Sequence, residues 1–415
     1  MAATHKLIPR RIAHAVELAL ADTPVVCILG PRQCGKSTLA ESLSPERRYF
    51  DLDQEDYALT AKDDPAGFIS ALPEYVTIDE VQRVPELLRN IKVSVDQNRK
   101  AGRFILTGSA NLLLLPKASE SLAGRMEIIQ MHPLTEAEKE RREGLFLRTL
   151  IDGQFKPEIR SAQEASKMSL SARLLAGGYP EAIKRTGHRA QQWHLQYIRM
   201  IIERDVQDIA NIRDSSQLQR MLEKLALQSS SLLNASALSR ELGLNRETTD
   251  RYLDVLEKLF LIRRLPAWHQ NRAKRLVKSP KIHLLDSGLA ATLMDLDVDQ
   301  WNDRRSDFGR LLESFVIQQL IAQAGWTDGR LRFWHYRDRD QIEVDCVITK
   351  GSHLWGVEVK SAQSVSNSDT KGLRRLAEQS GAGFKAGIVL YSGNSLIQLG
   401  EGPFYAVPIS KLWEL

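Results

Sequence analysis

The stretch that most constrains the fold of this chain is residues 25–38, which read Val-Val-Cys-Ile-Leu-Gly-Pro-Arg-Gln-Cys-Gly-Lys-Ser-Thr. A short apolar run, typical of a buried strand, leads directly into Gly-x-x-x-x-Gly-Lys-Ser, and a helical pattern follows from Thr38. This is a P-loop in the strand–loop–helix context that the motif requires. A chance match is expected on the order of once per hundred chains of this length. The sequence therefore predicts a nucleotide-binding α/β fold.

The residue types in this loop suit phosphate binding. Gly30 and Gly35 allow the backbone to turn tightly, so that successive N–H groups point at phosphate oxygens. We expect Lys36 to reach the β- and γ-phosphates and Ser37 to offer its hydroxyl to Mg²⁺, beside a helix N-terminus that carries partial positive charge. The predicted nucleotide-binding residues are Gly30, Pro31, Arg32, Gln33, Cys34, Gly35, Lys36, Ser37 and Thr38.

A Walker B pattern follows the P-loop. Residues 75–80, Tyr-Val-Thr-Ile-Asp-Glu, form an apolar, β-branched run that ends in two acids. We expect Asp79 to hold the Mg²⁺ shell together with Ser37, and Glu80 to polarise the attacking water. An acid pair at a strand end is common in any fold, but at this distance behind a P-loop it indicates catalysis.

Small polar residues end the next apolar strand, residues 103–110. We expect Thr107 and Ser109 to lie between Walker B and the γ-phosphate and to respond to that phosphate, whereas the alternative is a turn supplied by Gly108. Arg125 follows at the rim of the predicted sheet, where an arginine can reach the ATP of a neighbouring subunit. An arginine that caps its own helix is the competing interpretation.

The length of the chain fits a protein of two or three domains. The 415 residues carry a net charge of +5, which permits a nucleic-acid partner without requiring one. The three cysteines have no metal-binding spacing, and Cys27 lies in an apolar strand, so a reducing cytoplasm is the expected location. No run approaches the length of a transmembrane helix, and we expect no membrane partner.

Alternating strands and helices as far as residue 134 predict a parallel sheet with helices on both faces. Helical periodicity over 135–215 predicts a lid on the nucleotide, and 216–290 follows the helix–turn–helix–strand order of a winged helix. An acid-free basic run, residues 263–281, suits phosphate contacts, although a solvated hairpin on a protein-interaction module is the alternative. The predicted DNA-binding residues are Arg272, Lys274, Arg275 and Lys278.

A second candidate catalytic site lies in residues 291–415. Glu313 lies on or near the apolar face of a predicted helix, and Asp345 and Glu358 lie at one end of two adjacent strands, with Lys360 on the same face as Glu358. Such carboxylates can share a hard cation, Mg²⁺ or Mn²⁺, as in a metal-dependent phosphodiesterase. The alternative is a salt-bridged hairpin.

These motifs together resemble a bacterial and archaeal group of AAA-type ATPases. The resemblance includes the P-loop and extends over the segments 78–80 (Ile-Asp-Glu), 106–109 (Leu-Thr-Gly-Ser), 122–125 (Leu-Ala-Gly-Arg), 178–181 (Gly-Tyr-Pro-Glu) and 280–289 (Pro-Lys-Ile-His-Leu-Leu-Asp-Ser-Gly-Leu). The tail resembles the PD-(D/E)XK nuclease superfamily, with Val344 where the signature has proline. The resemblance implies an AAA module that hydrolyses Mg-ATP, a winged helix and a nuclease-like C-terminal domain.

The expected protein is thus a DNA-directed ATPase, forming homo-oligomers, whose ATP hydrolysis drives action on DNA. The alternative is a signalling or scaffold ATPase whose C-terminal domain binds protein or nucleic acid without catalysis. The predicted domains are a P-loop core, a helical lid, a winged-helix-like domain and a nuclease-like domain, at residues 1–134, 135–215, 216–290 and 291–415.

Overall fold

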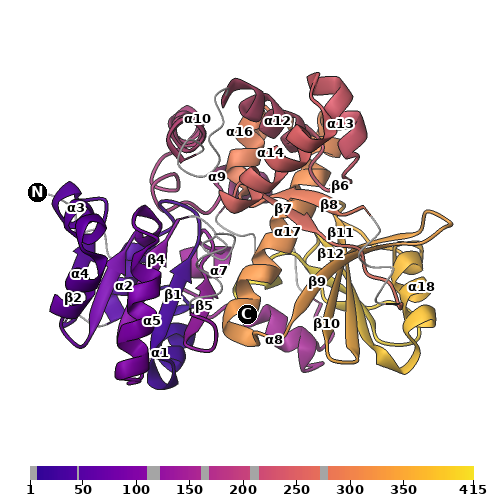
Figure 1. Cartoon of the computed structure of the whole chain (residues 1–415). Helices are drawn as coiled ribbons and strands as arrows, with labels where there is room; N and C mark the ends of the chain where they lie inside the picture. The colour runs from indigo at the N-terminus through magenta and orange to yellow at the C-terminus, as the bar shows by residue number, and fades with distance from the viewer. Residues whose placement is uncertain (1–6, 44–45, 110–121, 160–167, 206–214, 272–278) are drawn as a thin grey trace, which may run out of the picture. The chain divides into compact units, whose positions relative to one another are not determined.

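The structure, a computed structural model, describes residues 7–43, 46–109, 122–159, 168–205, 215–271 and 279–415. The chain divides into two compact units, of which the first is Met1–Leu134 with Lys258–Phe260 and the second is Thr135–Glu257 with Leu261–Leu415. Within the described residues, the first unit contains one sheet and the second unit contains two (Figure 1).

The sheet of the first unit is entirely parallel, which confirms the predicted arrangement. Its strand order is β2-β3-β4-β1-β5, so β4 lies between the P-loop strand and the Walker B strand. The carboxyl ends of these three neighbours therefore meet at one edge, which is where open α/β sheets bind their ligands. The strands are β1 (Val25–Leu29), β2 (Arg48–Asp51), β3 (Val76–Asp79), β4 (Phe104–Gly108) and β5 (Met126–Gln130).

Burial explains why these segments form strands and helices. Every residue of β1 and β4 is buried, as expected for parallel strands that are covered on both faces. The buried side chains of α5 are Leu87, Leu88, Ile91 and Val95, which share one face of an amphipathic helix. The described helices of this unit are α1 (Ala13–Asp22), α2 (Lys36–Leu43), α3 (Glu55–Asp63), α4 (Pro65–Ala71), the 3₁₀ turn η1 (Val81–Arg83) and α5 (Leu87–Gln97).

In the second unit, two short helices are tied to a long one, α17 (Arg305–Thr327). The N–H of Glu136 donates to Gln319 Oε1 at 2.9 Å, and the N–H of Leu147 donates to Gln323 Oε1 at 3.0 Å. Amides that a helix N-terminus leaves unpaired thus find partners on α17. The elements here are α7 (Glu136–Lys139), α8 (Phe146–Ile151), α9 (Leu170–Ala176), α10 (His188–Met200) and the π-turn η3 (Ile201–Asp205). Their role as a lid on a nucleotide stays a prediction.

Three helices and a small antiparallel sheet follow. Asn234 caps α13 by accepting a hydrogen bond from the N–H of Ala237, and Gly243 ends this helix at a φ of +66°. The sheet order is β6-β8-β7, so β8 is hydrogen-bonded on both sides. In chain order the elements are α12 (Ser215–Leu227), β6 (Ser231–Leu232), α13 (Ala235–Leu242), α14 (Arg246–Lys258), β7 (Ile262–Leu265) and β8 (Lys281–Leu284). This is the order expected of a winged helix, and the assignment is still a prediction.

The C-terminal part contains a six-stranded mixed sheet in the order β13-β14-β12-β11-β10-β9. Strand β10 pairs antiparallel with β9 and β11, whereas β12 pairs parallel with β11 and β14. Leu373 and Leu376 of α18 pack with Val344 of β10 in one buried apolar cluster. The elements, with α17, are α16 (Ser287–Leu293), η4 (Val298–Trp301), β9 (Arg332–Arg337), β10 (Glu343–Lys350), β11 (His353–Lys360), η5 (Asn367–Thr370), α18 (Lys371–Ser380), η6 (Gly381–Gly383), β12 (Phe384–Tyr391), β13 (Ile397–Gln398), β14 (Phe404–Pro408) and α19 (Lys411–Glu414). Across the described ranges, no helix has the length and apolar character needed to cross a membrane.

Candidate functional site

The P-loop joins β1 to α2, and its two glycines are required by the geometry of the backbone. Gly35 has a φ of +99°, a conformation that L side chains rarely adopt. A Cβ atom added to Gly30 would lie 2.2 Å from the carbonyl oxygen of Met131, the residue that follows β5. Both motif glycines are therefore needed for the fold of the loop itself.

Two basic side chains shape this loop. Lys36 is the first residue of α2 and only 4% exposed, and its Nζ donates to the carbonyl oxygen of Pro31 at 2.9 Å. Arg10 donates to the carbonyl oxygens of Cys34 and His132, at 2.5 and 2.6 Å. Arg10 thus fastens the loop to the segment behind β5. Sequence reasoning missed Arg10, because it lies before the first helix and 24 residues from Cys34.

The Walker B aspartate is held from three sides. Thr107 donates to Asp79 Oδ1, and the hydroxyl of Tyr49 donates to Oδ2. Burial raises the pKa of Asp79 above its ordinary value, whereas hydrogen bonds from Tyr49 and Ser37 lower it and oppose this shift. Oxygen groups from Ser37 and Asp79 that lie together suit a hard cation such as Mg²⁺. Tyr49 was missed in the sequence, because nothing there indicates that β2 lies beside β3.

The second Walker B acid belongs to a small hydrogen-bonded cluster. Ser109 Oγ donates to Glu80 Oε2 at 3.0 Å, while Gln82 Nε2 donates to Ser109 Oγ at 2.9 Å and also to Glu80. The N–H of Glu80 donates to Thr107 Oγ1 at 3.2 Å. The structure thus brings Thr107 and Ser109 to the Walker B acids, and their response to a γ-phosphate is still a prediction. Gln82 was missed, although a polar residue so soon after an Asp-Glu pair is a usable signal.

Arg125 has an ion-pair partner in its own chain. Its Nη2 donates to Asp96 Oδ2 at 3.0 Å, and its Nη1 donates to the carbonyl oxygen of Ala123 at 3.1 Å. The hydrogen bond from Arg125 lowers the pKa of Asp96, which lies near the end of α5. These contacts favour a structural role, and action of Arg125 on a neighbouring subunit stays a prediction.

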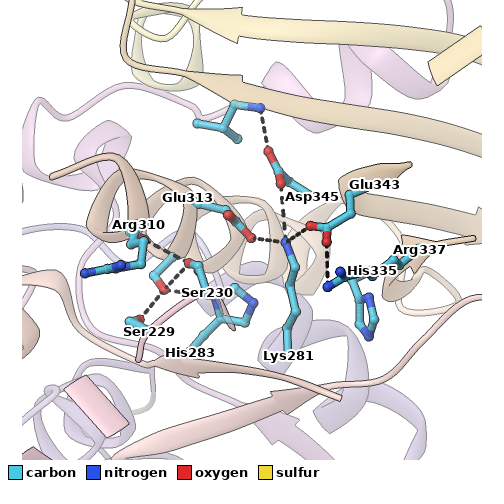
Figure 2. Close-up of polar contacts among 12 residues, drawn as sticks. Ser229, Ser230, Lys281, His283, Arg310, Glu313, His335, Arg337, Glu343 and Asp345 are labelled. Carbon is cyan, nitrogen blue, oxygen red and sulfur yellow. Dashed lines mark hydrogen bonds and ion pairs between the residues drawn. The ribbon is translucent and has the colours of Figure 1, made fainter. Parts of the chain in front are cut away.

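The predicted carboxylates of the second unit do come together, but they surround a lysine. Lys281 Nζ lies 2.9 Å from Glu313 Oε1, 3.4 Å from Asp345 Oδ1 and 3.7 Å from Glu343 Oε2 (Figure 2). Glu313 comes from α17, Asp345 and Glu343 from β10, and Lys281 from the start of β8. In the sequence Lys281 belongs to the basic run, and 64 residues separate it from Asp345, so this contact was not predicted.

Glu358 and its ion-pair partner Lys360 lie on β11, beside the strand that carries Asp345. Lys360 Nζ donates to Glu358 Oε1 at 2.8 Å, and Asp345 Oδ2 accepts from the N–H of Val359 at 2.9 Å. Burial and the charge of Asp345 raise the pKa of Glu358 to about 8, although Lys360 opposes the shift. Glu358 Oε2 is buried and has no hydrogen-bond partner among the described residues. We call Lys281, Glu313, Glu343, Asp345 and Glu358 the lysine–carboxylate cluster.

Within this cluster the carboxylates favour the charged form of Lys281 but disfavour one another's charged forms. Burial by itself lowers the pKa of Lys281, but the charges of Asp345 and Glu313 outweigh it and raise the pKa above its ordinary value. Burial and the charge of Asp345 raise the pKa of Glu313 well above its ordinary value, although Lys281 lowers it. Lys281 is therefore an ammonium ion throughout the neutral range.

The lysine–carboxylate cluster in this arrangement does not fit a second metal ion. Mg²⁺ takes oxygen ligands at about 2.0–2.1 Å in octahedral geometry. Here the space between Glu313 and Asp345 is taken by an amine nitrogen. Within the part of the chain that the structure describes, no group of three or more His, Cys, Asp or Glu side chains is arranged to hold a metal. A second Mg²⁺ or Mn²⁺ in the C-terminal domain is therefore not supported.

Within the described part of the basic run, residues 263–271 and 279–281, two of the basic side chains form ion pairs inside the protein. Arg264 pairs with Glu257 and with Asp254, the latter at 2.7 Å, and Lys281 lies in the lysine–carboxylate cluster. Burial lowers the pKa of Arg263 to about 10. Outside the described residues lie the four predicted DNA contacts, Arg272, Lys274, Arg275 and Lys278. DNA contact by this run stays a prediction.

Comparison with known proteins identifies three family models along the chain. Residues 22–139 match an AAA domain. Residues 167–300 match a domain of unknown function, DUF8612, and residues 308–412 match a second one, DUF4143. The AAA match includes the P-loop, the Walker B acids and both polar residues at the end of β4.

Relatives and solved structures are similar over most of the chain. A Walker-type ATPase of Pyrococcus abyssi is similar at 17% identity and a TM-score of 0.44, over 70% of this chain and 97% of that one. An uncharacterized protein of Haemophilus influenzae is 23% identical over 69% of this chain and 65% of its own length. Uncharacterized proteins of Mycobacterium tuberculosis and Mycobacterium bovis are each 31% identical over 367 residues, which is 87% of this chain and 76% of theirs. The chain, with its AAA domain and P-loop ATPase fold, belongs to the family of these mycobacterial proteins.

Proposed function

We propose that this protein binds Mg-ATP at the P-loop and hydrolyses it, and that hydrolysis drives an action on DNA. The observation that carries the first part is the meeting of the P-loop, the Walker B acids and the polar end of β4 at one sheet edge. Lys36 and Ser37 begin α2, whereas Asp79 ends β3, and this strand order brings the two segments to the same edge of the sheet.

The residues then have separate tasks. Mg²⁺, when bound with ATP, neutralises negative charge on the β- and γ-phosphate oxygens. Lys36 leaves the carbonyl oxygen of Pro31 for a phosphate oxygen, while Ser37 and Asp79 supply oxygen ligands. Glu80 orients the attacking water once its carboxylate is released from Gln82. Each of these charged groups exchanges one hydrogen bond for another, to phosphate or to water, so the net cost of the exchange is small.

Two substitutions test this assignment. Lys36→Ala should weaken nucleotide binding, because it removes the cation that faces the phosphates. Glu80→Gln should retain ATP binding and lower kcat by roughly 100-fold or more, as expected when a group that acts in the transition state is removed. Lys100→Ala is a suitable control, because Lys100 is exposed and pairs with Glu74. ATP affinity by calorimetry and phosphate release separate the two effects, and normal turnover by Glu80→Gln would remove Glu80 from this role.

The DNA-directed part is supported by the element order of α12–β8, which is that of a winged helix, and by the net charge of +5. The test is to measure ATP turnover with duplex, single-stranded, forked and four-way-junction DNA in the presence of Mg²⁺. Stimulation by any of these, abolished in Lys36→Ala, supports the proposal. Absence of both stimulation and binding across the panel contradicts it.

A scaffold ATPase whose C-terminal domain binds a partner without catalysis is the second candidate. The position of Lys281 inside the lysine–carboxylate cluster favours it over a nuclease, because the carboxylates already have a cation. Incubation of each DNA form with Mg²⁺ or Mn²⁺ distinguishes the two. Cleavage that Asp345→Asn abolishes would favour the nuclease.

A further inference from the structure

We propose that Lys281 is the resident cation of the lysine–carboxylate cluster, and that its ammonium group closes this cluster to divalent metal ions. The proposal concerns a site in the second unit and goes beyond ATP hydrolysis. It assigns to one lysine the electrostatic task that a bound metal performs elsewhere.

The backbone fixes where this ammonium group can be. Lys281 begins β8, the central strand of its sheet, and is paired with Leu232 on one side and Leu265 on the other. Its side chain is only 4% exposed. The pairing on both sides fixes the position of the Lys281 backbone, and the burial of its side chain keeps the amine inside the cluster.

The geometry around Nζ is that of a cation site. Carboxylate oxygens from α17 and β10 approach it at 2.9, 3.4 and 3.7 Å, and they converge from different elements (Figure 2). Buried charges of one sign repel one another unless a cation or a proton neutralises them. Lys281 provides that charge. The second oxygen of Asp345 is already occupied by the N–H of Val359, which fixes the orientation of this carboxylate.

Oxygen atoms suited to a metal become available if the amine is removed. Glu313 Oε1 and Asp345 Oδ1 lose their partner, and Glu358 Oε2 is buried and unpaired among the described residues. These oxygens belong to α17, β10 and β11, and the charge of Asp345 acts on both Glu313 and Glu358. Carboxylate oxygens are ligands that suit Mg²⁺ and Mn²⁺ once no ammonium group competes for them. Lys281→Met keeps the length and apolar stem of the side chain but removes the charge.

The experiment measures Mn²⁺ binding to the full-length chain without nucleotide, by the decrease of the free Mn²⁺ electron paramagnetic resonance signal. Asp79→Asn serves as the background in every sample, because it removes the Walker B carboxylate of the nucleotide site. We expect the background protein to bind no Mn²⁺ at this cluster and Lys281→Met to gain one site. Adding Asp345→Asn to Lys281→Met should abolish that site.

Thermal unfolding gives a second readout with a matched control. Lys281→Met should lower the midpoint, and millimolar Mn²⁺ should restore it, because an ion that binds only the folded state stabilises it. Lys411→Met is the control, because Lys411 is similarly buried, at 7% exposure, but pairs with Glu158 at 2.8 Å and with Glu414 at 4.0 Å, outside the lysine–carboxylate cluster. Lys411→Met should also lower the unfolding midpoint, but Mn²⁺ should not restore it.

Two results would overturn the proposal. The first is folded Lys281→Met protein that gains neither Mn²⁺ binding nor rescue. The second needs no substitution at Lys281, and therefore holds even if that variant fails to fold. It is Mn²⁺ binding by the background protein that Asp345→Asn removes, since this would show that a metal enters the cluster with the lysine in place.

Discussion

Tyr49 shows how a single hydroxyl tunes the nucleotide site. It donates to Asp79 Oδ2, while Thr107 donates to Oδ1, so both oxygens of the predicted Mg²⁺ ligand have partners. Burial raises the pKa of Asp79, and the hydrogen bond from Tyr49 is the largest of the contributions that lower it. The hydrogen bond from Tyr49 therefore favours the ionised form of this buried carboxylate, which is the form that binds a cation.

Replacing Tyr49 with Phe should move the acidic limb of the pH–activity profile to higher pH. Without the hydroxyl the pKa of Asp79 rises further, so that less of it is ionised at a given acidic pH. A hydrogen bond to a charged group contributes about 1.5–3 kcal/mol, and kcat/KM on the acidic limb should fall by roughly tenfold or more. Tyr57→Phe is the control, because Tyr57 packs its ring edge against Phe50. Overlapping profiles for Tyr49→Phe and the unsubstituted protein would contradict this role.

At the scale of elements, the strand order of the first sheet is what assembles the site. Strands β1, β3 and β4 are each buried throughout, and their apolar, β-branched runs predict them from sequence. Nothing in those runs indicates that β4 lies between β1 and β3, because neighbours in a parallel sheet need not be neighbours in the chain. The sequence therefore predicted a parallel sheet but not the order of its strands.

Contacts between distant elements account for the residues that sequence reasoning missed. Three carboxylates of the lysine–carboxylate cluster, Glu313, Asp345 and Glu358, were predicted from their places on one helix and two strands, whereas Glu343 was missed. Lys281 was not predicted, because the sequence of a basic run does not indicate that one of its lysine side chains is buried. The carboxylates that Lys281 contacts depend on where β8 packs in the tertiary structure. The same holds for Arg10, whose two acceptors belong to separate segments.

The predicted DNA contacts lie in the connection between β7 and β8, and their contribution to DNA affinity can be measured by substitution. Replacing Arg272, Lys274 and Arg275 together with Ala should weaken DNA binding to a similar extent for all sequences. The slope of log affinity against log salt should become shallower by roughly 0.9 units for each phosphate that is no longer neutralised. Fluorescence anisotropy at several salt concentrations measures both quantities.

A control for net charge uses exposed arginines of the same unit. Arg199, Arg246 and Arg330 each pair with a nearby carboxylate and are more than half exposed. Their joint replacement with Ala removes the same total charge. If both triple variants show the same reduction in salt slope, the effect is one of overall charge and the basic segment has no special part in binding.

For the molecule as a whole, assembly into oligomers can be tested through Arg125. In its own chain it forms a two-point ion pair with Asp96. If Arg125 has a purely structural role, substituting either partner of this pair should have the same effect. If Arg125 acts across an interface, only its own substitution should affect hydrolysis.

Arg125→Ala and Asp96→Ala separate these roles. If Arg125 reaches the ATP of a neighbour, Arg125→Ala should abolish hydrolysis with ATP affinity unchanged, whereas Asp96→Ala should retain it. Mixing Arg125→Ala with Lys36→Ala should then recover some turnover in mixed oligomers. If Arg125 is structural, both substitutions should lower the unfolding midpoint alike and no mixture should recover activity.

The position of Lys281 also decides how this chain can be divided for expression. The DUF4143 match begins at residue 308, whereas Lys281 falls within the preceding DUF8612 match. A fragment that starts at residue 308 keeps Glu313, Asp345 and Glu358 but leaves their ammonium partner behind. Excised along the family boundary, the C-terminal segment would carry an unbalanced group of acids and would bind divalent ions that the intact chain excludes. Cloning boundaries for this family should therefore begin before β8.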